Sequence, residues 1–159
     1  MASISPEEAK KKILRFCAYQ ERCHQEVKQK LYELGLYAAE ADELMVYLIT
    51  EGFLNEERFA RVFAGGKFRM KQWGRMKITR ELESRNLSPR CIRLGLQEID
   101  EDDYRKTLNG LIERKYSQVS ADNDFVRRDK LARYAIQKGY EPDLVWQTIR
   151  ELLPSRKRK

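Results

Sequence analysis

The feature that most constrains the fold of this 159-residue chain is a short helical pattern that recurs three times. In each copy, two apolar residues four positions apart are followed, four residues later, by Gly or Asn and then by a large apolar residue. The copies are Val27-Leu31-Gly35-Leu36, Ile78-Leu82-Asn86-Leu87 and Leu131-Ala135-Gly139-Tyr140. Gly and Asn adopt the left-handed conformation at the lowest cost, so each is expected to end a helix.

The spacing of these stop residues, 51 and 53 positions, sets the size of the repeating unit. Apolar residues elsewhere also recur at the helical period, and no stretch alternates in the manner of a strand. We therefore predict an all-α protein of three tandem three-helix-bundle repeats that form an elongated, curved molecule. The predicted repeats cover residues 1–53, 54–101 and 102–153, and a basic disordered tail covers 154–159.

Several helix starts are marked by residues that cap helices well. Ser5, Asn55 and Ser88 each precede a helical pattern, and their side chains can accept hydrogen bonds from the first turn. Asp122 is expected to do the same for a helix that places Phe125 in the core.

Two segments predict interruptions. Gly65-Gly66 predicts a kink or an early end of its helix, because Gly weakens a helix by about 1 kcal/mol relative to Ala. The acidic run Glu98–Asp103 is interpreted as a linker between repeats, although such a run could also bind a cation.

The net charge of +7 comes from one part of the chain. Residues 61–93 contain ten Lys or Arg and only two acidic residues, so the rest of the chain is close to neutral. Basicity of this kind favours a polyanionic partner, either nucleic acid or an acidic protein surface, over a general solubility effect.

The candidate partner-binding residues form two clusters. Trp73 lies within the first cluster and could stack on a base, anchor an interface or pack on the core. The first cluster contains Lys67, Arg69, Lys71, Arg75, Lys77 and Arg80 around this Trp, and the second contains Arg127, Arg128, Lys130 and Arg133.

Motifs for enzyme chemistry are missing from the sequence. No arrangement of Ser, Cys, His and acidic residues suggests nucleophilic catalysis, a metal site or a phosphate loop, so we expect no catalytic residue, no metal and no cofactor. The three cysteines have no regular spacing and are expected to be reduced thiols. The residues 1–12 do not form a signal peptide and no apolar run is long enough for a membrane, so we expect a cytoplasmic monomer without a membrane partner.

Four stretches of the chain resemble the RecX family of bacterial RecA regulators, over about residues 8–153. The most specific are the segment Tyr47–Ala60, which is similar to the family signature, and Trp73–Leu82, which resembles its G-x-x-K-I-x-x-E-L element. Arg22–Val27 and Lys130–Tyr140 are similar to elements of the first and third repeats. The chain departs from the usual pattern at Asn55-Glu56-Glu57, where an Asp is common, and at Cys23 or His24, where Ser is usual.

The resemblance implies a fold of tandem three-helix repeats and a specific function. RecX-like proteins bind the RecA–DNA filament, suppress its ATPase activity, strand exchange and growth, and have no catalytic residues of their own. The predicted partners are therefore the RecA filament and, more weakly and in a salt-dependent way, single- and double-stranded DNA. The alternative is a nucleic-acid-binding helical protein that acts without RecA, since three-helix units can place a helix in a DNA groove.

Overall fold

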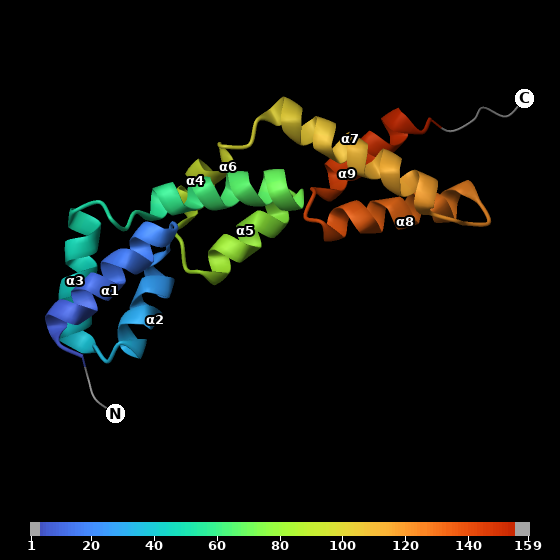
Figure 1. Ribbon diagram of the computed structural model, residues 1–159. Coiled ribbons are helices and arrows are strands. Elements are labelled where there is room, and N and C mark those ends of the chain that lie inside the picture. Colours follow the sequence, from blue (N-terminus) through green and yellow to red (C-terminus); the bar gives the residue numbers. More distant parts are fainter. Residues whose placement is uncertain (1–3, 155–159) are drawn as a thin grey trace, which may run out of the picture. The chain divides into compact units, whose positions relative to one another are not determined.

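The computed structural model describes residues 4–154 and shows an all-helical chain (Figure 1). The described residues contain nine α-helices, one π-helical segment and no strand. The elements are α1 (Pro6–Tyr19), α2 (His24–Glu33), α3 (Ala38–Thr50), α4 (Glu56–Gly66), η1 (Lys67–Lys71), α5 (Arg75–Ser84), α6 (Pro89–Leu96), α7 (Glu101–Gln118), α8 (Asp124–Gln137) and α9 (Pro142–Leu152). The predicted tail, apart from Pro154, lies outside the described residues.

The three predicted helix stops are confirmed by the backbone. Gly35, Asn86 and Gly139 have φ angles of 91°, 62° and 106°, in the left-handed region. The amide of the next residue donates to a carbonyl five residues earlier, as in Leu36 N to Leu31 O at 3.0 Å. These hydrogen bonds close the last turn of each helix, which is why the pattern recurs at these positions.

Three of the predicted helix starts are also confirmed. The Ser5, Asn55 and Ser88 side chains accept hydrogen bonds from backbone amides three residues later, at 3.2, 2.9 and 3.1 Å. Each bond satisfies an amide that has no partner within the helix.

Three local expectations were wrong, the first of them in part. Glu98 and Asp100 lie in the connection between α6 and α7, as expected of a linker, but Asp100 caps α7 and Glu101, Asp102 and Asp103 form its first turn, where acidic groups interact favourably with the helix dipole. Asn123, not Asp122, caps α8. Phe125 is 78% exposed, because it lies in the first turn of α8, ahead of the buried face that begins at Leu131.

The chain divides into two compact units. Unit 1 comprises residues 1–63 and 82–95, and unit 2 comprises 64–81 and 96–159. The predicted middle repeat is therefore shared between the two units, and the three-repeat division itself stays a prediction.

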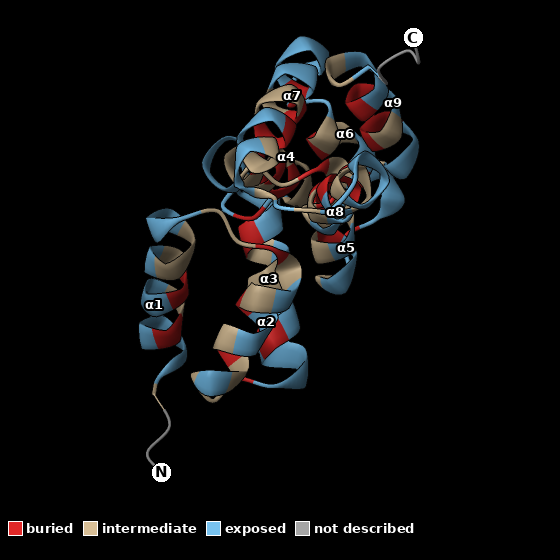
Figure 2. Cartoon of the chain, turned by 90° about the vertical axis from the view of Figure 1, so that its right-hand side faces the viewer, coloured by how far each residue is buried: buried red, intermediate tan, exposed pale blue. Residues whose placement is uncertain are grey.

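Unit 1 is organised around the bundle of α1, α2 and α3. Its core includes Ile13, Leu31 and Leu48, which are completely buried, and Figure 2 shows buried residues along one face of α1. Helix α6 packs closely against α4 at Gly95. A Cβ added at this position would lie only 2.7 Å from the Ala60 carbonyl oxygen. Ion pairs such as Arg58–Glu21, at 2.6 Å, connect α4 to the segment that follows α1.

Unit 2 is organised around the bundle of α7, α8 and α9, together with the segment 64–81. Three aromatic rings form a row in its interior: Phe68 packs on Tyr104 at 5.8 Å between ring centroids, and Tyr104 packs on Tyr140 at 4.9 Å. These rings place η1 against the start of α7 and the end of α8.

No helix among residues 4–154 is long and apolar enough to cross a membrane.

Candidate partner-binding surface

The segment between α4 and α5 carries half of the cations of the first predicted basic cluster, together with Trp73. Regular α-helical geometry ends at Gly66, as the Gly pair predicts, and five residues then form the π-helical segment η1. Gln72 ends it in the left-handed conformation, with φ 57°. The chain therefore turns sharply just before Trp73, and Arg69 and Lys71 remain exposed on the turn.

Backbone hydrogen bonds attach this turn to the end of α8. The Gly74 amide donates to the Lys138 carbonyl at 2.8 Å, and the Met76 amide donates to the Gly139 carbonyl at 2.9 Å. A Cβ at Gly74 would lie 2.3 Å from the Gly139 carbonyl carbon, so the approach requires Gly. The Tyr140 hydroxyl donates to the Gln72 carbonyl at 2.9 Å and fixes the residue before Trp73.

Arg75 binds acidic residues within unit 2. Its guanidinium pairs with Glu141 at 2.8 Å and with Glu101 at 3.0 Å. The Tyr104 hydroxyl accepts from the Arg75 amide at 2.9 Å and donates to Glu141 at 2.6 Å. The first turn of α5 is thus held by a network of hydrogen bonds to the starts of α7 and α9.

Burial and the contacts within this network keep the Tyr104 hydroxyl protonated and the Arg75 guanidinium charged. Burial raises the pKa of Tyr104, and the hydrogen bond with Glu141 raises that pKa further. Burial lowers the pKa of Arg75, but the hydrogen bonds and charges of Glu101 and Glu141 outweigh this effect and raise it overall. Arg75 therefore stays charged, and its guanidinium is paired inside the unit.

Two of the other cations of the first cluster, Lys67 and Lys77, lie beside the Trp73 ring. The ammonium groups of Lys67 and Lys77 lie 5.2 and 4.7 Å from the ring centroid, distances at which the electrons of the ring attract a cation. Lys138, at the end of α8, lies close to this group, because its Nζ donates to the Lys71 carbonyl at 3.1 Å. Burial lowers the pKa of Lys138, and the positive charges of Lys77 and Arg114 lower it further.

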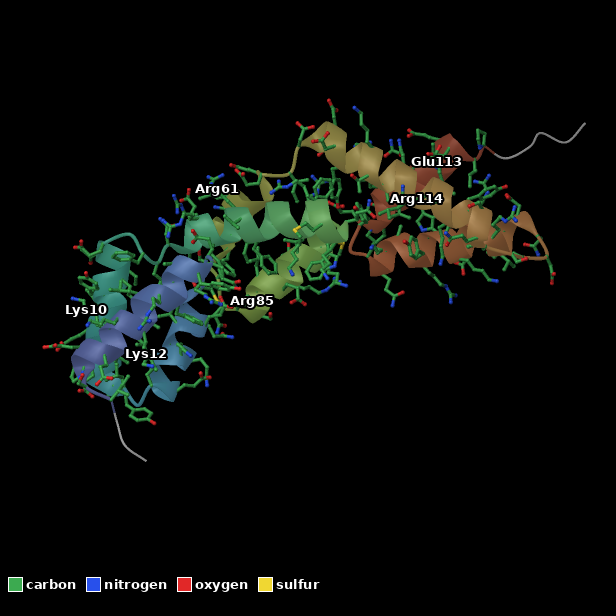
Figure 3. All side chains as sticks on the ribbon, viewed as in Figure 1. Lys10, Lys12, Arg61, Arg85, Glu113 and Arg114 are labelled. Atoms are coloured by element: carbon green, nitrogen blue, oxygen red, sulfur yellow. The ribbon has the colours of Figure 1, made fainter. Side chains whose placement is uncertain are left out.

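We call Lys67, Trp73, Lys77, Arg114 and Lys138 the Trp73 cluster. The sequence interpretation identified the first three and missed Arg114 and Lys138. Arg114 projects from α7 (Figure 3), far along the chain from the basic run. Lys138 lies directly before the Gly139 helix stop. Its place in the repeating pattern is the sequence feature that could have identified this lysine.

The cations of the second predicted cluster, on α8, bind carbonyl and carboxylate groups of their own unit. Arg128 is only 14% exposed; it pairs with Asp124 at 2.6 Å and also donates to the Leu153 carbonyl. Arg127 and Lys130 donate to the carbonyls of Val119 and Ser120, at 3.1 and 2.9 Å. Arg133 is 81% exposed, although it pairs with Asp129 at 3.0 Å. Three of the four therefore fix the ends of the bundle.

The two predicted clusters do not merge into one site. Arg127 lies at the end of the first turn of α8 and Lys138 follows its last residue, a separation of about 16 Å along the axis at 1.5 Å per residue. Of the predicted residues, the structure brings Lys67, Trp73 and Lys77 together and leaves Arg69, Lys71 and Arg80 exposed nearby in the sequence. Among residues 4–154, no group of three His, Cys, Asp or Glu side chains could hold a metal ion.

These features define a class of protein: an all-helical chain of small three-helix bundles with a local cationic surface. The particular family is identified by comparison. A model of the second three-helix domain of RecX matches residues 55–96, and a model of the third matches residues 101–149. The chain belongs to the RecX family, whose members are regulatory proteins and not enzymes.

Individual relatives agree with this assignment. A regulatory protein RecX from Prosthecochloris aestuarii is 25% identical over 96% of this chain and 99% of its own length. A regulatory protein RecX from Clostridium tetani is 25% identical over 88% of this chain. The matched region spans only 63% of the length of that clostridial relative.

A solved structure supports the fold. The crystal structure of RecX from Lactobacillus salivarius matches with a TM-score of 0.84 and 20% sequence identity, over 92% of this chain and 96% of that chain. At this level of identity, the likeness extends to the fold alone.

Proposed function

We propose that this chain is a negative regulator of the RecA recombinase. It binds the RecA–DNA filament and inhibits its ATPase activity, strand exchange and growth, and thereby modulates DNA repair and homologous recombination. Membership of the RecX family is the observation that carries this proposal. The proposed place of action is the bacterial cytoplasm, and the proposed state is a monomer.

The Trp73 cluster supplies a physical basis for binding to such a filament. Trp73 holds the Lys67 and Lys77 ammonium groups near its ring, so these side chains lose less freedom when they meet an anion. Burial and, after it, the charges of Lys77 and Arg114 lower the pKa of Lys138, and an acidic protein surface or a DNA phosphate would offset the repulsion from these two cations. Binding through these groups weakens steeply as salt is added.

The test is RecA-driven strand exchange with and without the protein. We expect inhibition at a ratio near one molecule per few RecA subunits, and no inhibition at that ratio would reject the proposal. The double variant Lys77→Glu/Lys138→Glu should relieve most of the inhibition. Arg133→Glu is the matched control, because it reverses an exposed charge on α8 outside the Trp73 cluster.

DNA binding without RecA is the rival function. It would require a reading helix, and α5 is poorly suited to that role: the amides of Arg75 and Met76 at its start are bonded to Tyr104 and Gly139, and the Arg75 guanidinium is paired. Equal affinity for bare DNA and for the RecA filament would favour this rival.

A further inference from the structure

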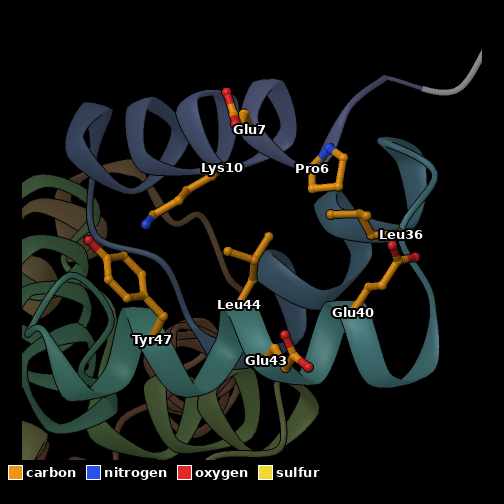
Figure 4. A pocket seen from close by; sticks show the side chains of 8 residues that line it. All are labelled: Pro6, Glu7, Lys10, Leu36, Glu40, Glu43, Leu44 and Tyr47. Atoms are coloured by element: carbon orange, nitrogen blue, oxygen red, sulfur yellow. The ribbon is translucent and has the colours of Figure 1, made fainter.

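Unit 1 contains a pocket of about 410 Å³ between α1 and α3 (Figure 4). Its apolar part is formed by Pro6, Leu36, Leu44 and Tyr47. A volume in this range is typical of sites that bind a ligand or a few side chains of a partner. The surface is therefore suited to an apolar group from outside the unit.

The rest of the pocket lining is mainly acidic. Glu40 and Glu43 lie on α3, at the same helical face as Leu44 and Tyr47, and Glu7 lies on α1. All three carboxylates are exposed. Within residues 4–154, none of them has an ion-pair partner, so their charges are available to a partner.

Lys10 shows what kind of group the pocket accepts. This residue supplies the single ammonium group of the lining, and its Nζ lies 4.0 Å from the centre of the Tyr47 ring. In Figure 4, Lys10 extends from α1 toward Tyr47. An ammonium beside an aromatic face and an acidic rim is a stable arrangement, and a basic residue of a partner would find the same environment.

We propose that this pocket is a docking site for a basic amphipathic helix of a partner protein. A large apolar side chain of that helix enters the space between Leu44 and Tyr47, and its flanking Lys or Arg residues pair with Glu40 and Glu43. Apolar anchors surrounded by complementary charge are the usual basis of helix recognition in a groove. Nucleic acid and anionic lipid do not fit, because the carboxylates repel phosphate. The inference does not depend on the proposed RecA regulation.

The experiment uses the full chain and a synthetic 15-residue helical peptide with Leu at three- and four-residue spacing and Lys at the other positions. The control peptide has Gln in place of Lys. We expect amide chemical-shift changes in α1 and α3 with the Lys peptide and affinity at least about tenfold higher than for the Gln peptide, equivalent to 1.4 kcal/mol. Shift changes confined to unit 2, or equal affinity for both peptides, would overturn the proposal.

Matched variants locate the effect on the pocket. Glu43→Lys should weaken binding of the Lys peptide by about tenfold, equivalent to 1.4 kcal/mol. Asp42→Lys makes the same change of charge on α3, but Asp42 lies about 200° around the helix from Glu40 and outside the pocket. It should have little effect, and an equal loss in both variants would contradict a localised site.

Lys10 provides a test in the opposite direction. Lys10→Gln removes the ammonium that occupies the Tyr47 face, so the Lys peptide should bind more tightly, by roughly threefold. Weaker or unchanged binding would show that the pocket does not accept the basic group of a partner in this way. Circular dichroism of each variant checks that the fold is intact.

Discussion

The two basic regions of unit 2, at residues 67–80 and 127–133, look alike in sequence but differ in what their cations bind. Around Trp73, Lys67 and Lys77 are held beside an aromatic ring and near further cations. On α8, Arg127, Arg128 and Lys130 donate to carbonyls of their own unit. Lys138 of the Trp73 cluster also donates to a carbonyl, that of Lys71, at 3.1 Å. The difference teaches that the density of positive charge in a sequence does not show which groups each cation meets in the fold.

Arg75 lies inside the first region, but its side chain binds groups of its own unit, as the arginines of the second region do. It is two residues from Lys77, but its guanidinium binds Glu101 and Glu141. Its removal should therefore destabilise the unit, whereas removal of Lys77 should weaken binding.

The largest expected effect comes from breaking the attachment of the Trp73 turn to α8. Gly74→Ala places a Cβ against the backbone of Gly139 and should destabilise unit 2 by about 3 kcal/mol. It should also relieve inhibition of RecA, because the Trp73 cluster loses its support. Urea unfolding followed by Trp fluorescence reports on unit 2, since Trp73 and Trp146 both belong to it.

Gly66→Ala is the control for this prediction. A Cβ at Gly66 meets nothing within 4 Å, and its backbone is helical. The change should leave stability unchanged or raise it by up to about 1 kcal/mol. Equal destabilisation by both substitutions would show that the contact with Gly139 is unimportant.

The next largest effect concerns the Arg75 network. Arg75→Met leaves the Glu101 and Glu141 carboxylates without the guanidinium and should cost about 2 kcal/mol, although the Tyr104 hydroxyl keeps its bonds to the backbone amide of residue 75 and to Glu141. This is less than the 3–5 kcal/mol of a fully buried pair, because Glu101 is more than half exposed. The same fluorescence-detected unfolding measures it. A loss of inhibition without a loss of stability would place Arg75 on the binding surface instead.

A smaller effect is expected on α8. Arg128→Gln removes the pair with Asp124 and the bond to the Leu153 carbonyl, and should destabilise unit 2 by about 1.5 kcal/mol. The salt dependence of filament binding should not change. When a cation that contacts phosphate is removed, the slope of log affinity against log salt concentration changes by about one unit. A change of that size in Arg128→Gln would show that Arg128 also binds the filament, so the two regions would not differ in this respect.

The smallest effect is a shift in the titration of Lys138. Its pKa is lowered by burial and by the charges of Lys77 and Arg114, so folding disfavours its charged form. This cost is present below the lowered pKa of the folded state and disappears as the pH rises toward the ordinary value of 10.5. Lys77→Gln should raise the pKa of Lys138, measured by NMR of the side chain, whereas Lys130→Gln should not.

Much of the fold could be predicted because the signals are local. The left-handed stops at Gly35, Asn86 and Gly139, and the caps at Ser5, Asn55 and Ser88, depend on residues within a few positions of each other. The errors arose where one local signal had two meanings. The acidic run at 98–103 suits a linker and a first helical turn equally well, and only the hydrogen bond from the Asp103 amide to Asp100 distinguishes them.

The sequence by itself determined the helical class, the repeating stop, the family and the concentration of charge near Trp73. Only the tertiary structure decided which groups each of those charges meets. Arg75 finds Glu101 and Glu141 at separations of 26 and 66 residues, and Trp73 lies near Lys138 because Gly74 meets the backbone at the end of α8. The electrostatic energy of a charge depends on its distance from other charges in space, and a linear sequence does not contain those distances.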